Sequence, residues 1–290
     1  MAKIGAPEPQ TASDYEDRTT AAIKSVLVEI GQILGSFRGK FAVVGGAVPW
    51  LLLNNAEMPH VGTGDIDLDL HAEALEEDNE YVDLVNALMG HGYVQGDDTR
   101  RFQLKRQVPS TDGGPPINVI VDFLMPRDAE LTKNIPPILS DFAVQKADGA
   151  DLALRFYQMV AVEGAMPGGG QNCVEIAVAS IPALLAMKGY AINGRDKQKD
   201  AYDIYYCIRN YEGGPAALAK ECQPILAEEK GRLGYQYIDQ KFRHVDDYGP
   251  HCVRKFLSNT QISQGRTGEE WQQDAFGQVE AWLKALGIRV

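Results

Sequence analysis

The sequence predicts an α/β (α+β) protein in which a half built on a mixed sheet is followed by a mainly helical half. Helical and strand patterns alternate up to about residue 124, short strands and loops fill roughly 125–180, and helical patterns alone follow. A chain of 290 residues is long enough for two domains. We place them at 13–180 and 181–290, after a flexible tail at 1–12 that is rich in Pro, Ala and polar residues.

The elements of the first half are predicted from hydrophobic period and turn residues. Ser13 is expected to cap a helix whose apolar stripe ends near Gly35, and a short buried strand running into Gly45 and Gly46 follows. Pro49 is acceptable in the next helix because it lies in the first turn. In chain order we then expect a helix at 47–55, a strand at 62–70, a helix at 78–93, and strands at 101–106 and 117–124.

The helices of the second half are predicted from apolar residues that recur at helical spacing. The glycine-rich segment "MPGGGQN" is a clear break, and a strand is expected just after it at 172–180. Helices are then predicted at 181–192, 197–210, 214–229 and 269–286.

Composition limits the class of protein. The net charge of −12 argues against a non-specific nucleic-acid coat and against a membrane-surface protein, although a local basic groove is compatible with it. The four cysteines show no CxxC spacing, which favours buried thiols in a reducing compartment. The N-terminus has no apolar signal segment, and no apolar run is long enough to span a bilayer. We therefore expect a cytoplasmic protein.

The segment "GTGDIDLDL" carries the main functional signal. Asp65, Asp67 and Asp69 alternate with Ile and Leu, so a strand here has one apolar face and one face of carboxylates. Aspartate is poorly suited to a strand interior, and neighbouring anions on one face repel unless a cation lies between them. Oxygen ligands of this kind suit Mg²⁺. The alternative is a strand with a solvated acidic face.

Two further segments sharpen the magnesium interpretation. In "INVIVDFL", Asp122 is a lone carboxylate in an apolar run, which is costly if buried without a cation; the alternative is that it faces water at a strand end. Upstream, Gly45 and Gly46 end a strand and open a helix, where free N–H groups favour phosphate, although a tight turn explains them equally well. Together these segments have the layout needed for two-metal nucleotidyl transfer.

These residues carry a resemblance to a known family. "VVGGAVPWLLL…GTGDIDLDL…INVIVDFL" resembles the DNA polymerase β-like nucleotidyltransferase superfamily and, more closely, the AbiEii-type toxin nucleotidyltransferases, which typically carry Thr or Ser before Asp-x-Asp, as Thr63 stands here. The later family pattern Lys…Arg…Lys-Asp…Asp is matched in "LLAMKGYAINGRDKQKDAYDIYYCI". The matching positions are Lys188, Arg195, Lys199, Asp200 and Asp203.

The basic segment is interpreted in the light of that resemblance. Lys188, Arg195 and Lys199 could bind a triphosphate, and Arg can fork onto phosphate oxygens. Asp200 and Asp203, one turn apart, could orient Lys188 or Arg195 by ion pairing. Without the upstream motif, a solvated charged helix face would be preferred.

The resulting hypothesis is a Mg²⁺-dependent nucleotidyltransferase that moves an NMP from an NTP to an acceptor hydroxyl. Asp65, Asp67 and Asp122 are the catalytic and metal-binding carboxylates, with two ions expected, and Gly45, Gly46, Thr63, Lys188, Arg195 and Lys199 bind the nucleotide. The resemblance implies an RNA acceptor such as tRNA and a cognate antitoxin protein. The alternatives are an aminoglycoside-like small-molecule acceptor, and a non-catalytic nucleotide-binding protein of the same fold.

Overall fold

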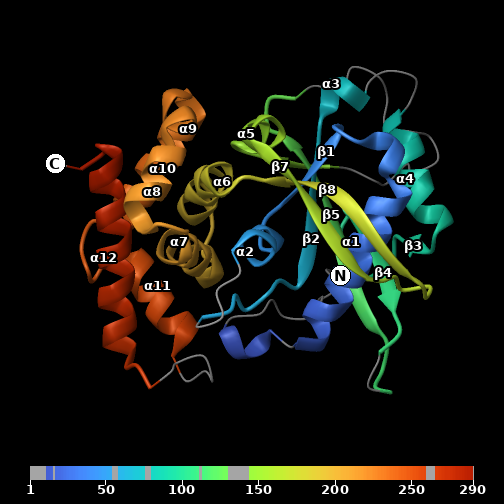
Figure 1. Cartoon of the computed structure of the whole chain (residues 1–290), viewed down its shortest axis with the longest axis horizontal. Helices are drawn as coiled ribbons and strands as arrows, with labels where there is room; N and C mark the ends of the chain where they lie inside the picture. The colour runs from blue at the N-terminus through green and yellow to red at the C-terminus, as the bar shows by residue number, and fades with distance from the viewer. Residues whose placement is uncertain are drawn as a thin grey trace. The chain divides into compact units, whose positions relative to one another are not determined.

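The computed structural model describes residues 11–15, 17–53, 58–75, 80–110, 113–129, 144–258 and 265–289 (Figure 1). Most of the predicted tail at 1–12 lies outside these residues. At its end, Thr11 caps a short 3-10 helix, Ala12–Asp14, in a capping box with Asp14. Thr11 is therefore the cap in this region, and the predicted capping role of Ser13 is wrong.

The protein is a mixed α/β protein whose sheet has eight strands in the described residues. The strand order is β3-β4-β5-β2-β1-β8-β7, with β6 paired to β5. Pairs β2–β5, β1–β8 and β5–β6 are parallel and the others are antiparallel. The strands are β1 Phe41–Val44, β2 Asp65–Leu70, β3 Tyr93–Val94, β4 Gln103–Val108, β5 Ile117–Pro126, β6 Gln145–Ala147, β7 Tyr157–Ala165 and β8 Gln171–Ala179.

Helices precede, interrupt and follow the strands. Up to β7 they are α1 Asp17–Ile33, the 3-10 helix Gly35–Phe37, α2 Ala47–Leu52, α3 Ala72–Leu75, α4 Glu80–Gly90 and α5 Ala150–Arg155. After β8 they are α6 Ile181–Gly194, α7 Gln198–Asn210, α8 Gly214–Glu221, α9 Gln223–Ala227, α10 Glu229–Lys241, α11 Tyr248–Leu257 and α12 Gly268–Leu286. The single helix predicted at 214–229 is in fact α8 and α9, because Pro224 restarts the helix in its first turn.

The chain forms two compact units. The sheet unit contains Glu16–Ala47 and Gly62–Ala179. The helical unit contains Ser180–Val290 together with two earlier segments, Glu8–Tyr15 and Val48–Val61.

In the sheet unit, α1 covers one face of the sheet (Figure 1). A side chain on Gly31 of α1 would overlap Val174 of β8, so glycine is what allows helix and strand to approach closely. The apolar side of β2 belongs to the buried core, where Ile66, Leu68 and Leu70 are all 0% exposed. Burial of this alternating set fixes the face on which the aspartates of β2 must lie.

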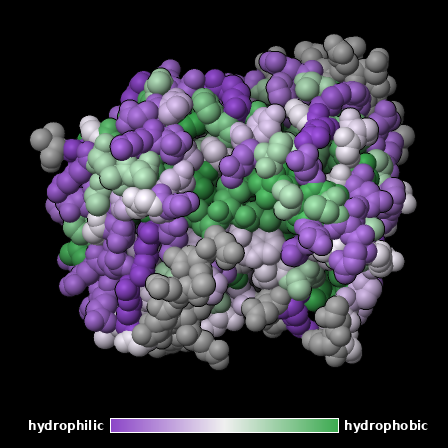
Figure 2. Space-filling view, viewed as in Figure 1, coloured by the Kyte–Doolittle hydropathy of each residue, from purple (hydrophilic) through white to green (hydrophobic). Residues whose placement is uncertain are grey.

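In the helical unit, glycines and aromatic residues set the packing. Gly189 of α6 faces the backbone of Gly234 in α10, and a Cβ on Gly189 would lie 1.9 Å from the Gly234 carbonyl oxygen. Helix α12 begins with a capping box of Thr267 and Glu270. Its inner side buries Trp271 and Trp282, and the surface over its outer side is largely hydrophilic (Figure 2). Among the described helices, none has the length and apolarity needed to cross a bilayer.

Candidate active site

Four carboxylates of the sheet unit form a row on the face opposite α1. Asp65, Asp67 and Asp69 lie on this side of β2, because their neighbours Ile66 and Leu68 fill the core on the other. In the parallel β2–β5 ladder, Asp122 is the register partner of Asp67. Paired residues of adjacent strands point to the same face, with strands about 4.8 Å apart. We call Asp65, Asp67, Asp69 and Asp122 the carboxylate row.

Burial increases along β2. Asp65 and Asp67 are partly exposed, whereas Asp69 is 0% exposed. Helix α5 packs on this end of the strands. Within the described residues, neither oxygen of the Asp69 carboxyl has a hydrogen-bond partner. Burial, followed by the nearby charges of Asp151 and Asp67, raises the pKa of Asp69 well above its ordinary value. The row therefore has an accessible end at Asp65 and Asp67 and a closed end at Asp69.

Gly45 makes room for one member of the row. It follows β1, has a left-handed backbone with φ of +70°, and a Cβ there would lie 1.8 Å from Oδ2 of Asp67. Gly46 completes the turn before α2. The first glycine of the pair is thus required both by its backbone conformation and by the carboxylate beside it.

Thr63 orients Asp65, another member of the carboxylate row. Its side chain is buried, and its hydroxyl donates a hydrogen bond of 2.9 Å to Oδ1 of Asp65. The contact holds the Asp65 carboxylate on the strand face. Within the described residues, no three His, Cys, Asp or Glu side chains are already gathered into a ready-made metal site.

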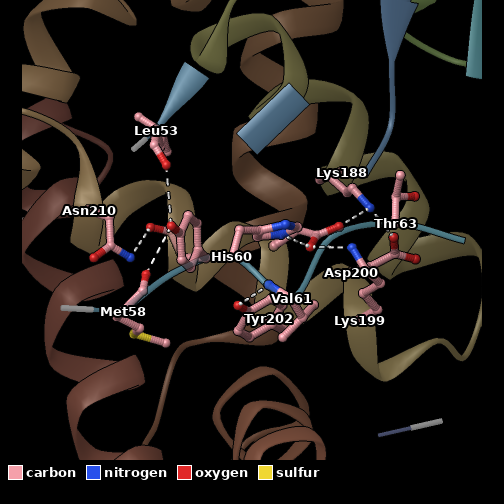
Figure 3. Close-up of polar contacts among 12 residues, drawn as sticks. Leu53, Met58, His60, Val61, Thr63, Lys188, Lys199, Asp200, Tyr202 and Asn210 are labelled. Atoms are coloured by element: carbon pink, nitrogen blue, oxygen red, sulfur yellow. Dashed lines mark hydrogen bonds and ion pairs between the residues drawn. The ribbon is translucent and has the colours of Figure 1, made fainter. Parts of the chain in front are cut away.

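A second group of charged residues lies in the helical unit (Figure 3). Asp203 is its centre: Oδ1 accepts from Lys199 Nζ at 2.8 Å and lies 3.0 Å from Nε2 of His60, and Oδ2 is 2.7 Å from Lys188 Nζ. Burial alone would raise the pKa of Asp203, but the charges of Lys188 and Lys199 outweigh burial, so the pKa lies well below its ordinary value. Asp203 is therefore an ionised carboxylate surrounded by donors.

Asp200, which lies one helical turn before Asp203, has a similar set of partners. Lys188 Nζ donates to Oδ1 at 2.7 Å, and Arg195 forks onto both oxygens, with Nε 2.7 Å from Oδ2 and Nη2 3.0 Å from Oδ1. Burial opposes ionisation, yet these cations lower the pKa of Asp200 to about 2. Lys188 is itself buried, and burial would lower its pKa, but the two carboxylates raise it above its ordinary value. Arg195 differs, since its side chain is 51% exposed.

His60 joins this group from a distant segment of the sequence. Burial, followed by the charge of Lys199, lowers the pKa of His60 to about 4, so the ring is neutral and its Nε2–H donates to Asp203. The ring packs against Tyr202 and Tyr206, whose centroids lie 5.4 and 4.7 Å away. Sequence reasoning missed His60, because nothing in its local pattern signals this partner 143 residues away. We call His60, Lys188, Arg195, Lys199, Asp200 and Asp203 the charge cluster.

Each residue predicted from the sequence lies in one of the two units. The sheet unit holds Gly45, Gly46, Thr63, Asp65, Asp67 and Asp122, and the helical unit holds Lys188, Arg195, Lys199, Asp200 and Asp203. The roles of these residues in binding and catalysis stay predictions.

Comparison with known proteins identifies the family. The model of "Nucleotidyl transferase AbiEii toxin, Type IV TA system" matches residues 34–277, which is most of the chain and includes both groups. The chain belongs to the AbiEii nucleotidyltransferase toxin family. It is accordingly a nucleotidyltransferase of the toxin–antitoxin class. No curated protein matches it.

Solved structures that align with most of the chain are also found. JHP933 from Helicobacter pylori has 12% identity and a TM-score of 0.42, over 94% of this chain and 95% of that one. MenT4, the nucleotidyltransferase toxin Rv2826c from Mycobacterium tuberculosis H37Rv, has 13% identity and a TM-score of 0.40, over 94% of this chain and 90% of that one.

Proposed function

We propose that this AbiEii-family protein transfers an NMP from an NTP to an acceptor hydroxyl in a Mg²⁺-dependent reaction, with tRNA as the acceptor. The observation that carries the proposal is the register of β2 and β5. It places Asp122 opposite Asp67 on the face that also carries Asp65. Carboxylates that two adjacent strands present on one face are an all-oxygen donor set of the kind that Mg²⁺ prefers.

The donors present fit such an ion. Asp65 and Asp67 form the accessible end of the row, and Gly45 leaves the space that the Asp67 carboxylate occupies. Asp65, Asp67 and Asp122 would hold the metal, with two ions expected. When bound, Mg²⁺ supplies positive charge that stabilises the attacking and leaving oxygens of phosphoryl transfer.

The remaining residues of the sheet unit position the reactants. Thr63 holds the Asp65 carboxylate through its hydroxyl. The turn at Gly45 and Gly46 is proposed to offer backbone N–H groups to the phosphates. Asp122, as a carboxylate of the same row, would accept the proton of the acceptor hydroxyl as that oxygen attacks.

The resemblance also assigns nucleotide binding to Lys188, Arg195 and Lys199. The charge cluster holds both lysine ammonium groups against buried carboxylates, whereas the Arg195 side chain is half exposed. We therefore expect Arg195 to contribute most to phosphate binding, with Asp200 fixing its guanidinium in place. Lys188 and Lys199 would act mainly through the geometry of the cluster.

The test is incubation of the protein with radiolabelled NTPs, Mg²⁺ and either bulk tRNA or aminoglycosides. Label on tRNA, lost in EDTA and in Asp67→Ala, is the expected result. Label on an aminoglycoside would instead support the small-molecule alternative, which the net charge of −12 favours because those acceptors are cationic. Absence of transfer to either acceptor would favour a non-catalytic nucleotide-binding protein. Coexpression with the protein encoded by the neighbouring gene tests the proposed antitoxin.

A further inference from the structure

The two faces of the β3-β4-β5 part of the sheet differ sharply. One face is covered by α1: Tyr93, Leu104 and Val119 are buried there, and Arg106 of β4 is ion-paired to Glu29 of α1. The other face is continuous with the carboxylate row. Its side chains are partly or fully exposed, and Val94 is 48% exposed, one of two large hydrophobic side chains of the described residues with such exposure.

Strand register shows which residues share that face. Asp67 of β2, Asp122 of β5 and Gln103 of β4 are successive register partners across the sheet, so Gln103 lies one strand beyond Asp122. The next series of register partners crosses the sheet from Asp65 through Ile120 and Lys105 to Val94. We call the residues beyond the carboxylates the open face. They are Val94, Gln103, Lys105, Gln107, Asn118 and Ile120.

The chemistry of the open face is neutral and amide-rich. Lys105 is already matched by Asp98, with Nζ 2.8 Å from each carboxylate oxygen. Gln103 accepts from the backbone N–H of Arg100 through Oε1, and Gln107 contacts Asn118. Side-chain amides both donate and accept, and so can hydrogen-bond to base edges and ribose hydroxyls. The apolar surface of Val94 and Ile120 suits the flat faces of bases.

From this arrangement we infer that the open face binds the single-stranded, hydroxyl-bearing end of an RNA acceptor and leads it to Asp122. The inference rests on the proposed function and assigns its acceptor site. Strands β3, β4 and β5 carry no carboxylate other than Asp122, so the contacts that the open face itself offers are amide and apolar ones, which suit a nucleotide chain better than a polycationic small molecule. Sequence-tolerant contacts to splayed-out bases are the usual way in which proteins hold single-stranded RNA.

Charge further restricts the ligand. The loop before β4 carries two exposed arginines, Arg100 and Arg101, together with Asp97 and Asp98, of which Asp98 is paired with Lys105. Phosphate contacts from the two arginines would give a logarithmic salt slope of only about −1.4 for a single strand. We expect a slope no steeper than this, because most of the contacts reach bases and riboses. A much steeper slope would place RNA binding on another, basic surface and overturn the inference.

The deciding experiment measures RNA binding without catalysis. A fluorescein-labelled single-stranded RNA of about 12 nucleotides is titrated with the full chain in the absence of NTP, and the dissociation constant is read from fluorescence anisotropy. Val94→Glu places a charge on the open face at its β3 edge and should weaken binding at least about tenfold. Tyr157→Glu is the matched control. Tyr157 is the other exposed large hydrophobic residue, 43% exposed, and lies on β7 at the far edge of the same sheet, so this change should leave affinity within about twofold.

A second variant tests Gln103, the register partner of Asp122 on the open face. Gln103→Leu removes the amide but keeps the size of the side chain, and it should raise KM for the RNA acceptor while KM for the NTP stays unchanged. Equal RNA affinity in wild type and Val94→Glu, or no RNA binding by the wild type, would overturn the inference. Failure of the proposed function looks different: wild type would bind the RNA, lose that binding in Val94→Glu, and transfer no nucleotide.

Discussion

Asp69 and Asp203 are both 0% exposed aspartates, yet they have opposite properties. The pKa of Asp69 is raised well above its ordinary value, because burial and the charges of Asp151 and Asp67 disfavour ionisation. The pKa of Asp203 is well below its ordinary value, because Lys188 and Lys199 outweigh burial. Burial is the same in both places; the partners differ. The carboxylate row is a group of like charges, whereas the charge cluster neutralises its own anions.

This difference separates stability from function. Removing one member of a self-neutralised buried cluster leaves a charge buried without a partner, and this lowers the stability of the fold. A row of like charges contributes little to stability and binds cations that come from outside. Substitutions in the two regions should therefore affect different measurements.

The largest effect is expected for Asp67→Ala. Loss of one of the carboxylates that hold the metal should lower nucleotidyl transfer by about a thousandfold or more, since charge stabilisation in the transition state depends on it. The free energy of unfolding should stay within about 1 kcal/mol of wild type, because a like charge beside Asp69 is removed. Radiolabelled transfer and urea denaturation measure the two quantities. Full activity in this variant would refute the catalytic assignment.

The opposite pattern is expected for Asp203→Ala. Lys188 and Lys199 would lose a buried partner, which should lower the free energy of unfolding by about 3–5 kcal/mol. Glu175→Ala is the control: it breaks an ion pair with Arg38 in which both side chains are 59% exposed, and it should cost at most about 1 kcal/mol. If the two variants are equally stable in chemical denaturation, the cluster does not stabilise the helical unit.

A smaller effect is expected for Gly45→Ala. The positive φ costs about 1–2 kcal/mol in any L-residue, and Gly39→Ala, with φ of +82° and no atom within 4 Å of its Cβ, isolates that cost. Gly45→Ala should in addition displace the Asp67 carboxylate and lower transfer at least about tenfold. Transfer rates and melting temperatures of the two variants are compared. Similar transfer in both would show that Gly45 serves only the turn.

The sequence predicts the carboxylate row better than the charge cluster, for a physical reason. Alternation along β2 is local, so the shared face of Asp65, Asp67 and Asp69 follows from period alone, and the strands at 62–70 and 117–124 are found close to their predicted positions. The pairing of Asp122 with Asp67 requires the sheet order. His60 and Asp203 are in contact although 143 residues separate them in the sequence, and no local sequence pattern can predict such a contact. The family pattern pointed to five residues of the charge cluster, and it left open whether the aspartates pair with Lys188 or with Arg195. In the structure, Asp200 pairs with both.

The charge cluster also predicts a pH dependence. Since burial lowers the pKa of His60 from 6.5 to about 4, the unfolded chain binds a proton across this window and the folded chain does not. The contribution of His60 to stability should therefore fall as pH falls from 6.5 to 4, by up to about 1.4 kcal/mol per pH unit. His60→Gln keeps a donor for Asp203 and removes the titrating ring, so its unfolding free energy should change less across the window. Asp203 itself would lose its stabilising effect only below its ordinary pKa of 3.8. Parallel curves for the two proteins would contradict the buried, neutral state of the ring.

The smallest effect tests how finely the carboxylate row is positioned. Thr63→Val keeps the size and burial of the side chain but removes the 2.9 Å hydrogen bond to Asp65, a contact worth about 1 kcal/mol. Transfer should fall by about fivefold, with a higher Mg²⁺ concentration needed for half-maximal rate, because a less ordered carboxylate holds a metal less well. Thr63→Ser restores the hydroxyl and should restore the Mg²⁺ dependence. Loss of transfer in Thr63→Ser equal to that in Thr63→Val would show that the methyl group, not the hydrogen bond, matters. Packing of the Thr63 methyl group, and not its hydrogen bond, would then position the carboxylate row. The charge cluster, by contrast, is positioned by its ion pairs.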